Sequence, residues 1–414
     1  MSSQRTAPPE RSEYVLDVYD KNSLSFIRGG PVCNLLKRAG LTPSSFRAAV
    51  ILSIVLAGFC LLPTIVLSAI DGKLLGGNVP MPLLGDVATL GRFLVALPAL
   101  ILIAPDNDGL LRRTIGHFLN GGLIKPEDRA AFGRVIASVL RLRDTVWPEL
   151  FIFMLALTPA LLAQEERPFL KPIESWHFGP GGELTLAGMW LEYAAKPVYL
   201  LVTLLWVWRL ILWTILLRRI CRLDLNLYAA HPDGTGGLGF LPAMQQRFSK
   251  FSFAGGVIIA GASANEILYH GATLEGIGWL PLTYIVVTTM LMCAPLIVLV
   301  PCLVALKRRG ILAYGALGNE YLRAFEAKWF AGPDGMRKPG PATDRKALEE
   351  LGSEYGTLTD LNAAYVVVQN LSIVPITKNV LIAITLPAIL PLVPVVFLAL
   401  GAQELLARLF ALLK

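Results

Sequence analysis

The chain has 414 residues, a mean hydropathy of +0.58, 54% hydrophobic residues and only 16% charged ones, which excludes an ordinary soluble protein. Its net charge of +7 is explained by the side of a membrane on which basic residues lie, so we expect no nucleic-acid partner. None of the five cysteines falls in a predicted exported loop, so we expect no structural disulfide.

Seven segments are long and apolar enough to cross a hydrocarbon core of ~30 Å at ~1.5 Å per residue. The third is short and is expected to continue an amphipathic helix that begins near Pro126. The sequence therefore predicts an all-α, polytopic integral membrane protein with about seven transmembrane helices and a helical cytoplasmic layer. The predicted spans are Ala48–Ile70, Val87–Ala104, Leu150–Leu162, Pro197–Leu217, Phe251–Tyr269, Leu280–Ala305 and Val380–Leu400.

The distribution of Lys and Arg over the connecting segments predicts the orientation. Of the 37 Lys and Arg residues, 29 fall on one side of the predicted spans, six on the other and two within spans. This split places the N-terminus in the cytoplasm, with anionic lipids of the bilayer against the cytoplasmic face. The prolines of the last span leave open whether it crosses the membrane or re-enters.

The chain is thereby divided into a cytoplasmic tail with an interfacial segment (1–46), spans 1 to 6 (47–305) with a cytoplasmic helical insertion (105–147), a cytoplasmic helical region (306–378), and the last span with a short amphipathic end (379–414). The loop Ala163–Lys196 on the opposite side is expected to be solvated.

A glycine-rich turn follows the fourth span. Its segment Gly234–Gly239 matches G-x-G-x-x-G, but a dinucleotide site requires a preceding strand in a βαβ unit, and membrane helices flank this turn. We therefore expect a tight turn whose glycines adopt positive φ, with a nest of backbone amides for an anion or nucleotide as the alternative. The candidate residues are His231, Asp233, Gly234, Gly236, Gly237 and Gly239.

This loop has the pattern HPD-x-x-GGLGFL and resembles that of an uncharacterised group of bacterial polytopic membrane proteins, where it follows an aromatic, arginine-bearing span. The similarity extends through Arg141-Leu-Arg-Asp144 and the proline-rich last span. The resemblance implies a bacterial origin, hence the cytoplasmic (inner) membrane, and a shared membrane fold. The resemblance implies no particular activity.

Charges inside spans are costly and usually face the protein interior or a watery path. Depth along the helices matches Glu266 with Arg92, and we expect these two to pair or to share water. Such pairs are as compatible with fixing helix register as with a conduction path. A second cluster is expected around Arg209, with Trp206, Trp213 and Glu149.

A stripe of small and polar residues on the fifth span would permit close helix packing or line a pore. We expect the chain to be a channel or channel-like permeation protein for small ions, formed by spans 4 to 6 in a homo-oligomer. The stripe comprises Ser252, Gly256, Ala260, Ser263, Glu266 and His270. The candidate path residues are Glu266, Asn265, Ser263, His270 and Arg92.

The alternative is a non-catalytic membrane scaffold or sensor that recruits an unspecified protein partner through its cytoplasmic helices. An enzyme acting on lipid-linked substrates ranks third, because Glu266 and His270 lie one helical turn apart but two ligands do not make a metal site. We expect no catalytic residues, no cofactor and no metal.

Overall fold

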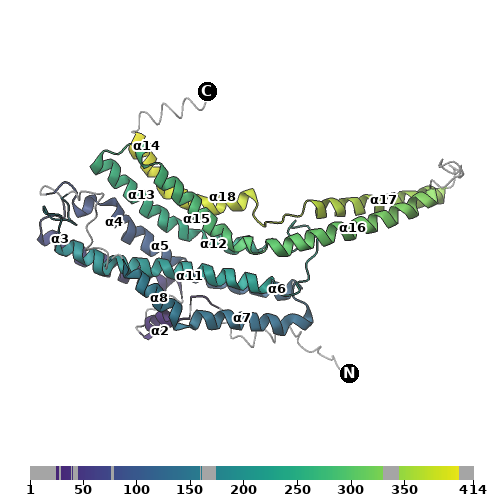
Figure 1. Cartoon of the computed structure of the whole chain (residues 1–414), viewed down its shortest axis with the longest axis horizontal. Helices are drawn as coiled ribbons and strands as arrows, with labels where there is room; N and C mark the ends of the chain where they lie inside the picture. The colour runs from purple at the N-terminus through teal and green to yellow at the C-terminus, as the bar shows by residue number, and fades with distance from the viewer. Residues whose placement is uncertain are drawn as a thin grey trace, which may run out of the picture.

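The computed structural model describes residues 25–27, 29–38, 40, 45–75, 79–158, 160, 174–329 and 345–400. Across these ranges the protein is all-helical, with 78% helix and no strands, which confirms the predicted all-α class. Figure 1 shows an elongated bundle whose helices run along its long axis. We call the end from which α16 (Val300–Trp329) and α17 (Arg345–Gln369) project the hairpin end, and the opposite end, which carries α14 (Leu274–Ile277), the loop end.

The other elements of the first half, in chain order, are α2 (Pro31–Arg38), α3 (Phe46–Ile70), η1 (Leu83–Gly85), α4 (Val87–Leu90), η2 (Gly91–Ala96), α5 (Leu97–Leu102), α6 (Ala104–Asn120), η3 (Pro126–Asp128), α7 (Arg129–Asp144) and α8 (Val146–Ala156). Those of the second half are α10 (Leu186–Trp190), η4 (Leu191–Ala195), α11 (Lys196–Ile220), α12 (Leu241–Phe248), α13 (Lys250–His270), α15 (Trp279–Ile297), α18 (Lys378–Ile389) and η5 (Leu390–Leu392). The segments η2 and η4 are single π-helical stretches within longer helical runs.

Six helical runs of the described chain are long and apolar enough to cross a membrane, as expected of a multi-pass membrane protein. Their outward side chains are apolar: Ile54 of α3 is 67% exposed and Leu282 of α15 is 62% exposed. The six runs are Phe46–Ile70, Val87–Asn120, Leu186–Ile220, Leu241–His270, Trp279–Ile297 and Lys378–Leu400.

The segment predicted as the third span is short, as expected, and Thr145 separates its helix from the amphipathic helix before it. Its helix, α8, covers Val146–Ala156 and is too short to cross a membrane alone. Residues 161 and 162 of that predicted span lie outside the described residues. The preceding amphipathic helix is confirmed as η3 and α7, which bury Phe132, Ile136 and Val139 and pack on α11.

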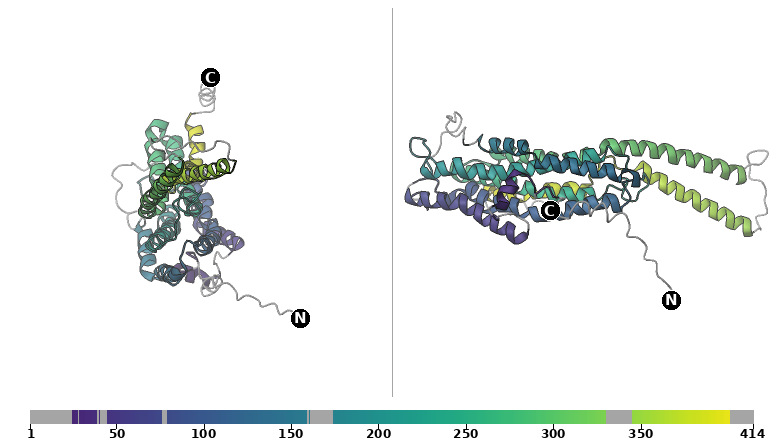
Figure 2. Two further views of the ribbon diagram at one scale, coloured as in Figure 1. Left: turned by 90° about the vertical axis from the view of Figure 1, so that its right-hand side faces the viewer. Right: turned by 90° about the horizontal axis from the view of Figure 1, so that it is seen from below.

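The predicted sixth span, Leu280–Ala305, is divided between α15 and α16, with a break at Val298 and Leu299. Pro301 follows the break and lacks the amide hydrogen that a continuous helix would use there. In the last run a 3-10 turn, η5, interrupts the helix around Pro391. Prolines therefore divide both runs, and Figure 2 shows α16 and α17 extending well beyond the other helices.

Small residues on α13 allow neighbouring helices to approach closely. A side chain added at Gly256 would place its Cβ 2.7 Å from the carbonyl oxygen of Ala388 on α18. At Gly261 the added Cβ would lie 2.6 Å from the Cα of Ala88 on α4. Ser252, Gly256, Ala260 and Ser263 are all buried, so this part of the predicted stripe packs against other helices of the same chain.

Gly256→Leu is expected to separate α13 from α18, because the contact is with backbone that cannot move aside. We expect a destabilisation of ~1–3 kcal/mol, read as a lower melting temperature in detergent. The control is Gly315→Ala on α16, where no atom lies within 4 Å of the added Cβ. Equal melting temperatures for the two variants would contradict the close approach.

Candidate functional site

A buried carboxylate, Asp86, joins three parts of the loop end. Its oxygens accept from the Thr89 amide (2.9 Å) and hydroxyl (2.7 Å), which caps α4. They also accept from Trp176 Nε1 at 3.1 Å and from the Asn265 amide nitrogen at 2.8 Å. One side chain thus connects α4, α13 and the segment before α10. Because Trp176 is fully buried, the expectation of a solvated loop is wrong for this part of it.

The candidate path residues occupy different environments from those predicted. Asn265 bonds Asp86 and accepts from the Val87 amide at 3.1 Å, so it fixes the start of α4. Ser263 is buried, and its hydroxyl finds no partner in the described part of the chain. The Glu266 carboxylate lies 3.5 Å from His270 Nδ1, and both side chains are substantially exposed at the loop-end edge of α13.

Arg92 does not meet Glu266. It lies in the π-helical stretch η2, and its guanidinium carbon is 5.9 Å from the ring centre of Tyr199 on α11. In the described part of the chain Arg92 makes no ion pair with Glu266. The prediction used only the depth of each residue along its helix. The two side chains face different neighbours, Tyr199 for Arg92 and His270 for Glu266.

A second buried acid, Glu192, sits in the other π-helical stretch, η4. It forms an ion pair with Lys196 one turn later, and its Oε1 lies 3.1 Å from His177 Nε2 without hydrogen-bond geometry. Burial lowers the pKa of His177, although the nearby Glu192 carboxylate acts in the opposite direction. Short π-helical stretches often accompany functional positions. Asp86, His177 and Glu192 were not among the predicted site residues.

The predicted cluster around Arg209 is present in part. The Arg209 guanidinium carbon lies 4.6 Å from the ring centre of Trp206, whose Nε1 donates to the Leu100 carbonyl at 2.9 Å. Trp213 is fully buried in the core. Glu149 lies near Arg209 but forms no ion pair with it in the described part of the chain; its Oε2 instead accepts from the Val32 amide at 2.7 Å.

That bond is one of several that hold α2 and the residues before it on the bundle, including one from Arg143 to the Ser25 carbonyl. Asp144 Oδ1 accepts from the Gly30 amide at 3.1 Å, and Ser25 donates to Asp108 at 2.5 Å. Burial would raise the pKa of Asp144, but its hydrogen bonds with Arg143 and Gly30 outweigh that effect and hold the pKa below its usual range. The interfacial segment is thereby fixed beside α8.

The glycine-rich loop is a tight turn with positive φ at Gly234, Gly236 and Gly237, as predicted. The alternative, an anion-binding nest, is disfavoured because the chain's own aspartate fills it. Asp233 accepts from the amides of Thr235 (2.8 Å), Gly237 (3.1 Å) and Gly239 (2.8 Å). Burial would raise the pKa of Asp233, but these three bonds outweigh it and lower the pKa.

The loop also holds the base of the α16–α17 hairpin. The Ser372 amide donates to the Gly234 carbonyl at 2.8 Å, and Lys307 of α16 donates to the Leu371 carbonyl at 3.0 Å. Beside the loop lies an open hollow of about 430 Å³ lined by both loop and α6 residues, including His231 and His117. The glycine-rich loop, which we call the HPD loop after its first three residues (His231–Asp233), therefore connects the bundle to the hairpin.

In the described ranges no group of three or more His, Cys, Asp or Glu side chains could hold a metal ion. No protein-family model, no curated protein and no solved structure matches this chain.

Asp233→Ala is expected to leave three loop amides without an acceptor, which should cost ~1–3 kcal/mol locally. Hydrogen exchange should accelerate at Thr235, Gly237 and Gly239 and at the Ser372 amide that the loop holds. The control is Asp224→Ala, which removes an exposed carboxylate that bonds only Lys125. Unchanged exchange in Asp233→Ala would contradict the role of this side chain in the HPD loop.

Proposed function

We propose that the chain is a non-catalytic membrane scaffold whose α16–α17 hairpin presents a surface to a protein partner. The observation that carries the proposal is the hairpin itself, a helix pair that leaves the bundle and keeps most of its side chains at the surface. Leu312 is 75% exposed, Tyr355 is 62% exposed and Leu317 is 50% exposed. Large apolar side chains that are exposed on a projecting element are available to contact a partner.

The hairpin is also ordered without help from the bundle along its outer part. Lys328 of α16 forms ion pairs with Glu350 (2.5 Å) and Glu354 (2.6 Å) of α17, and Trp329 Nε1 donates to Glu354 at 2.6 Å. Tyr321 donates to the Glu354 carbonyl at 2.7 Å. A preformed pair of helices loses less conformational freedom on binding a partner than a flexible segment does.

We further propose seven crossings, with α8 contributing to the third, in a bacterial inner membrane with the N-terminus in the cytoplasm. Glu149 of α8 bonds Val32 beside Arg209, whereas Ser175 pairs with Met81 at the loop end. Along the continuous run of η4 and α11 these two levels, marked by Glu192 and by Arg209, are about 25 Å apart at ~1.5 Å per residue. This separation, close to the thickness of a ~30 Å core, supports a crossing between the two levels. The excess of Lys and Arg in the segments at the hairpin end favours a cytoplasmic location for that end.

A photo-crosslinking residue placed at Leu312 or Tyr355 in living cells is expected to capture a protein, because both side chains are exposed on the hairpin. The control places the same residue at Leu282, which faces outward on α15 and should meet lipid. Removal of residues 309–375 should abolish assembly of the captured partner, whereas Glu266→Gln should leave it intact. Absence of protein crosslinks at every exposed hairpin position would refute the scaffold.

A channel for small ions is the second candidate, and one observation favours it. Glu266 and His270 form an exposed acid–imidazole pair at the loop-end edge of α13, where several copies could present a ring of such pairs. The buried part of the α13 stripe packs within one chain, so such a path would run between copies of a homo-oligomer. Asn265 would then hold α13 against α4 next to this edge, through its bonds with Asp86 and Val87.

For the channel, ion flux is measured in liposomes that contain the purified wild-type chain or Glu266→Gln. A path at this edge predicts that the substitution lowers the preference for cations over anions, because it removes the charge that attracts them. The matched control is Glu275→Gln, which removes an acid from the neighbouring α14. Identical ion selectivity in all three proteins would exclude Glu266 from the path.

A further inference from the structure

A partly open cavity of about 250 Å³ lies between α2, α3, α5 and α11, at the level where the interfacial segment meets the bundle. Its walls are almost entirely aliphatic and include Leu52, Leu56, Leu100 and Leu205. Leu35 of α2 lines it and is 68% exposed, so the cavity opens beside the amphipathic helix. A hydrocarbon chain fits such walls without leaving polar groups unpaired.

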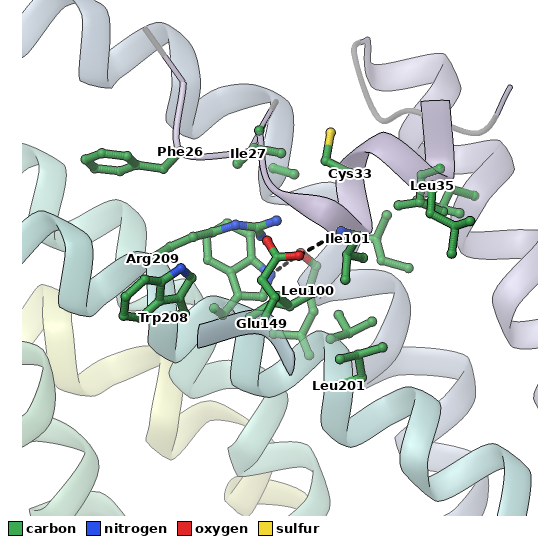
Figure 3. Close-up of a pocket in the computed structure, with 18 of the residues that line it drawn as sticks. Phe26, Ile27, Cys33, Leu35, Leu100, Ile101, Glu149, Leu201, Trp208 and Arg209 are labelled. Atoms are coloured by element: carbon green, nitrogen blue, oxygen red, sulfur yellow. Dashed lines mark hydrogen bonds between the residues drawn. The ribbon is translucent and has the colours of Figure 1, made fainter. Parts of the chain in front are cut away.

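One end of this cavity is polar, as Figure 3 shows, and holds hydrogen-bond donors without acceptors. Arg209 makes no ion pair or hydrogen bond in the described part of the chain; its guanidinium stacks on Trp206, and Asp108 and Glu149 are nearby acids. Trp208 lines the same cavity, and its Nε1 is buried with no partner among the described residues. Buried hydrogen-bond donors normally have acceptors. We therefore expect an oxygen atom of a bound ligand to accept from the Arg209 guanidinium and from Trp208 Nε1.

The same end carries one acceptor. Glu149 faces Arg209 across the head of the cavity (Figure 3) without forming an ion pair in the described structure. Only its Oε2 is engaged, by the Val32 amide. Arg143 also lines the cavity, but it is paired with Asp144 and donates to the Ser25 carbonyl. Among the described residues the cavity therefore presents one guanidinium without an acceptor, a neutral donor, and a carboxylate oxygen. A ligand with adjacent negative and positive groups complements this arrangement better than a purely anionic one, which Glu149 would repel.

We propose that this cavity binds one phospholipid with a primary amine in its head group, phosphatidylethanolamine in chemical class. One acyl chain occupies the aliphatic walls and enters past Leu35. The phosphate oxygens accept from the Arg209 guanidinium and Trp208 Nε1. The ammonium donates to Glu149, a contact that a fully methylated choline cannot make because it has no N–H. This site is independent of the hairpin and of the Glu266 edge.

The test is native mass spectrometry of the full chain released from nanodiscs with equal parts of phosphatidylethanolamine, phosphatidylcholine and phosphatidylglycerol. The wild-type chain is expected to retain one phosphatidylethanolamine, about tenfold more often than either other lipid, since a hydrogen bond to a charged group contributes on this scale. Equal retention of the three lipids, or preferential retention of phosphatidylglycerol, would overturn the proposal.

Three variants separate the parts of the site. Arg209→Gln should lose retained lipid of every class, and Leu205→Trp should do the same by filling the chain site while leaving the head-group residues in place. Glu149→Gln keeps an acceptor for the Val32 amide and should remove only the preference over phosphatidylcholine. The matched controls are Arg222→Gln and Glu127→Gln, both exposed charges outside the cavity. A loss of retention in the controls equal to that in the site variants would mean general surface attraction and would also overturn the proposal.

Discussion

A polar group inside a membrane has to find its partner within the protein, and this constraint organises the structure from one end to the other. At the loop end it is met by Asp86, which gathers a hydroxyl, an indole and a side-chain amide from three separate parts of the chain. At the level of α2 it is met by Glu149 and Asp144, whose carboxylates receive the amides at the start of that helix. The hydrophobic segments determine that the helices enter a membrane, and these few carboxylates determine which helices meet.

Much of the architecture follows from patterns in the sequence. Long apolar runs predict the spans, and the spacing of Phe132, Ile136 and Val139 predicts which face of α7 is buried. The cluster of glycines after His231 predicts a turn with positive φ. These features depend on local chain geometry, where sequence periodicity and structure are directly related. The cap of α18 by Thr377 is of the same kind.

Contacts between distant segments could not be predicted in the same way. Depth along a helix gives one coordinate, so Arg92 and Glu266 share a level, but the rotation of each helix decides that Arg92 faces Tyr199. The π-helical stretches η2 and η4 shift that rotation further, and nothing in their composition distinguishes them from ordinary helix. The contacts of buried His177 and Glu192 with each other and with Lys196 could not be predicted, because a loop histidine is usually solvated. For Asp233 the turn was predictable, but the carboxylate that occupies its amides was not.

The break at Val298 and Leu299 has a mechanical consequence for the hairpin. Because α15 and α16 are separate helices, a tilt of α16 is not forced on the membrane helix that precedes it. Beyond the break, Gly310 of α16 lies close to Ala229 and Val368, and this contact can act as the pivot of such a tilt. From there to Trp329 the helix is about 28 Å long, so a rotation of ~10° displaces its tip by about 5 Å. A small rotation of α16 about this contact is therefore largest at the tip of the hairpin and does not require α15 to rotate with it.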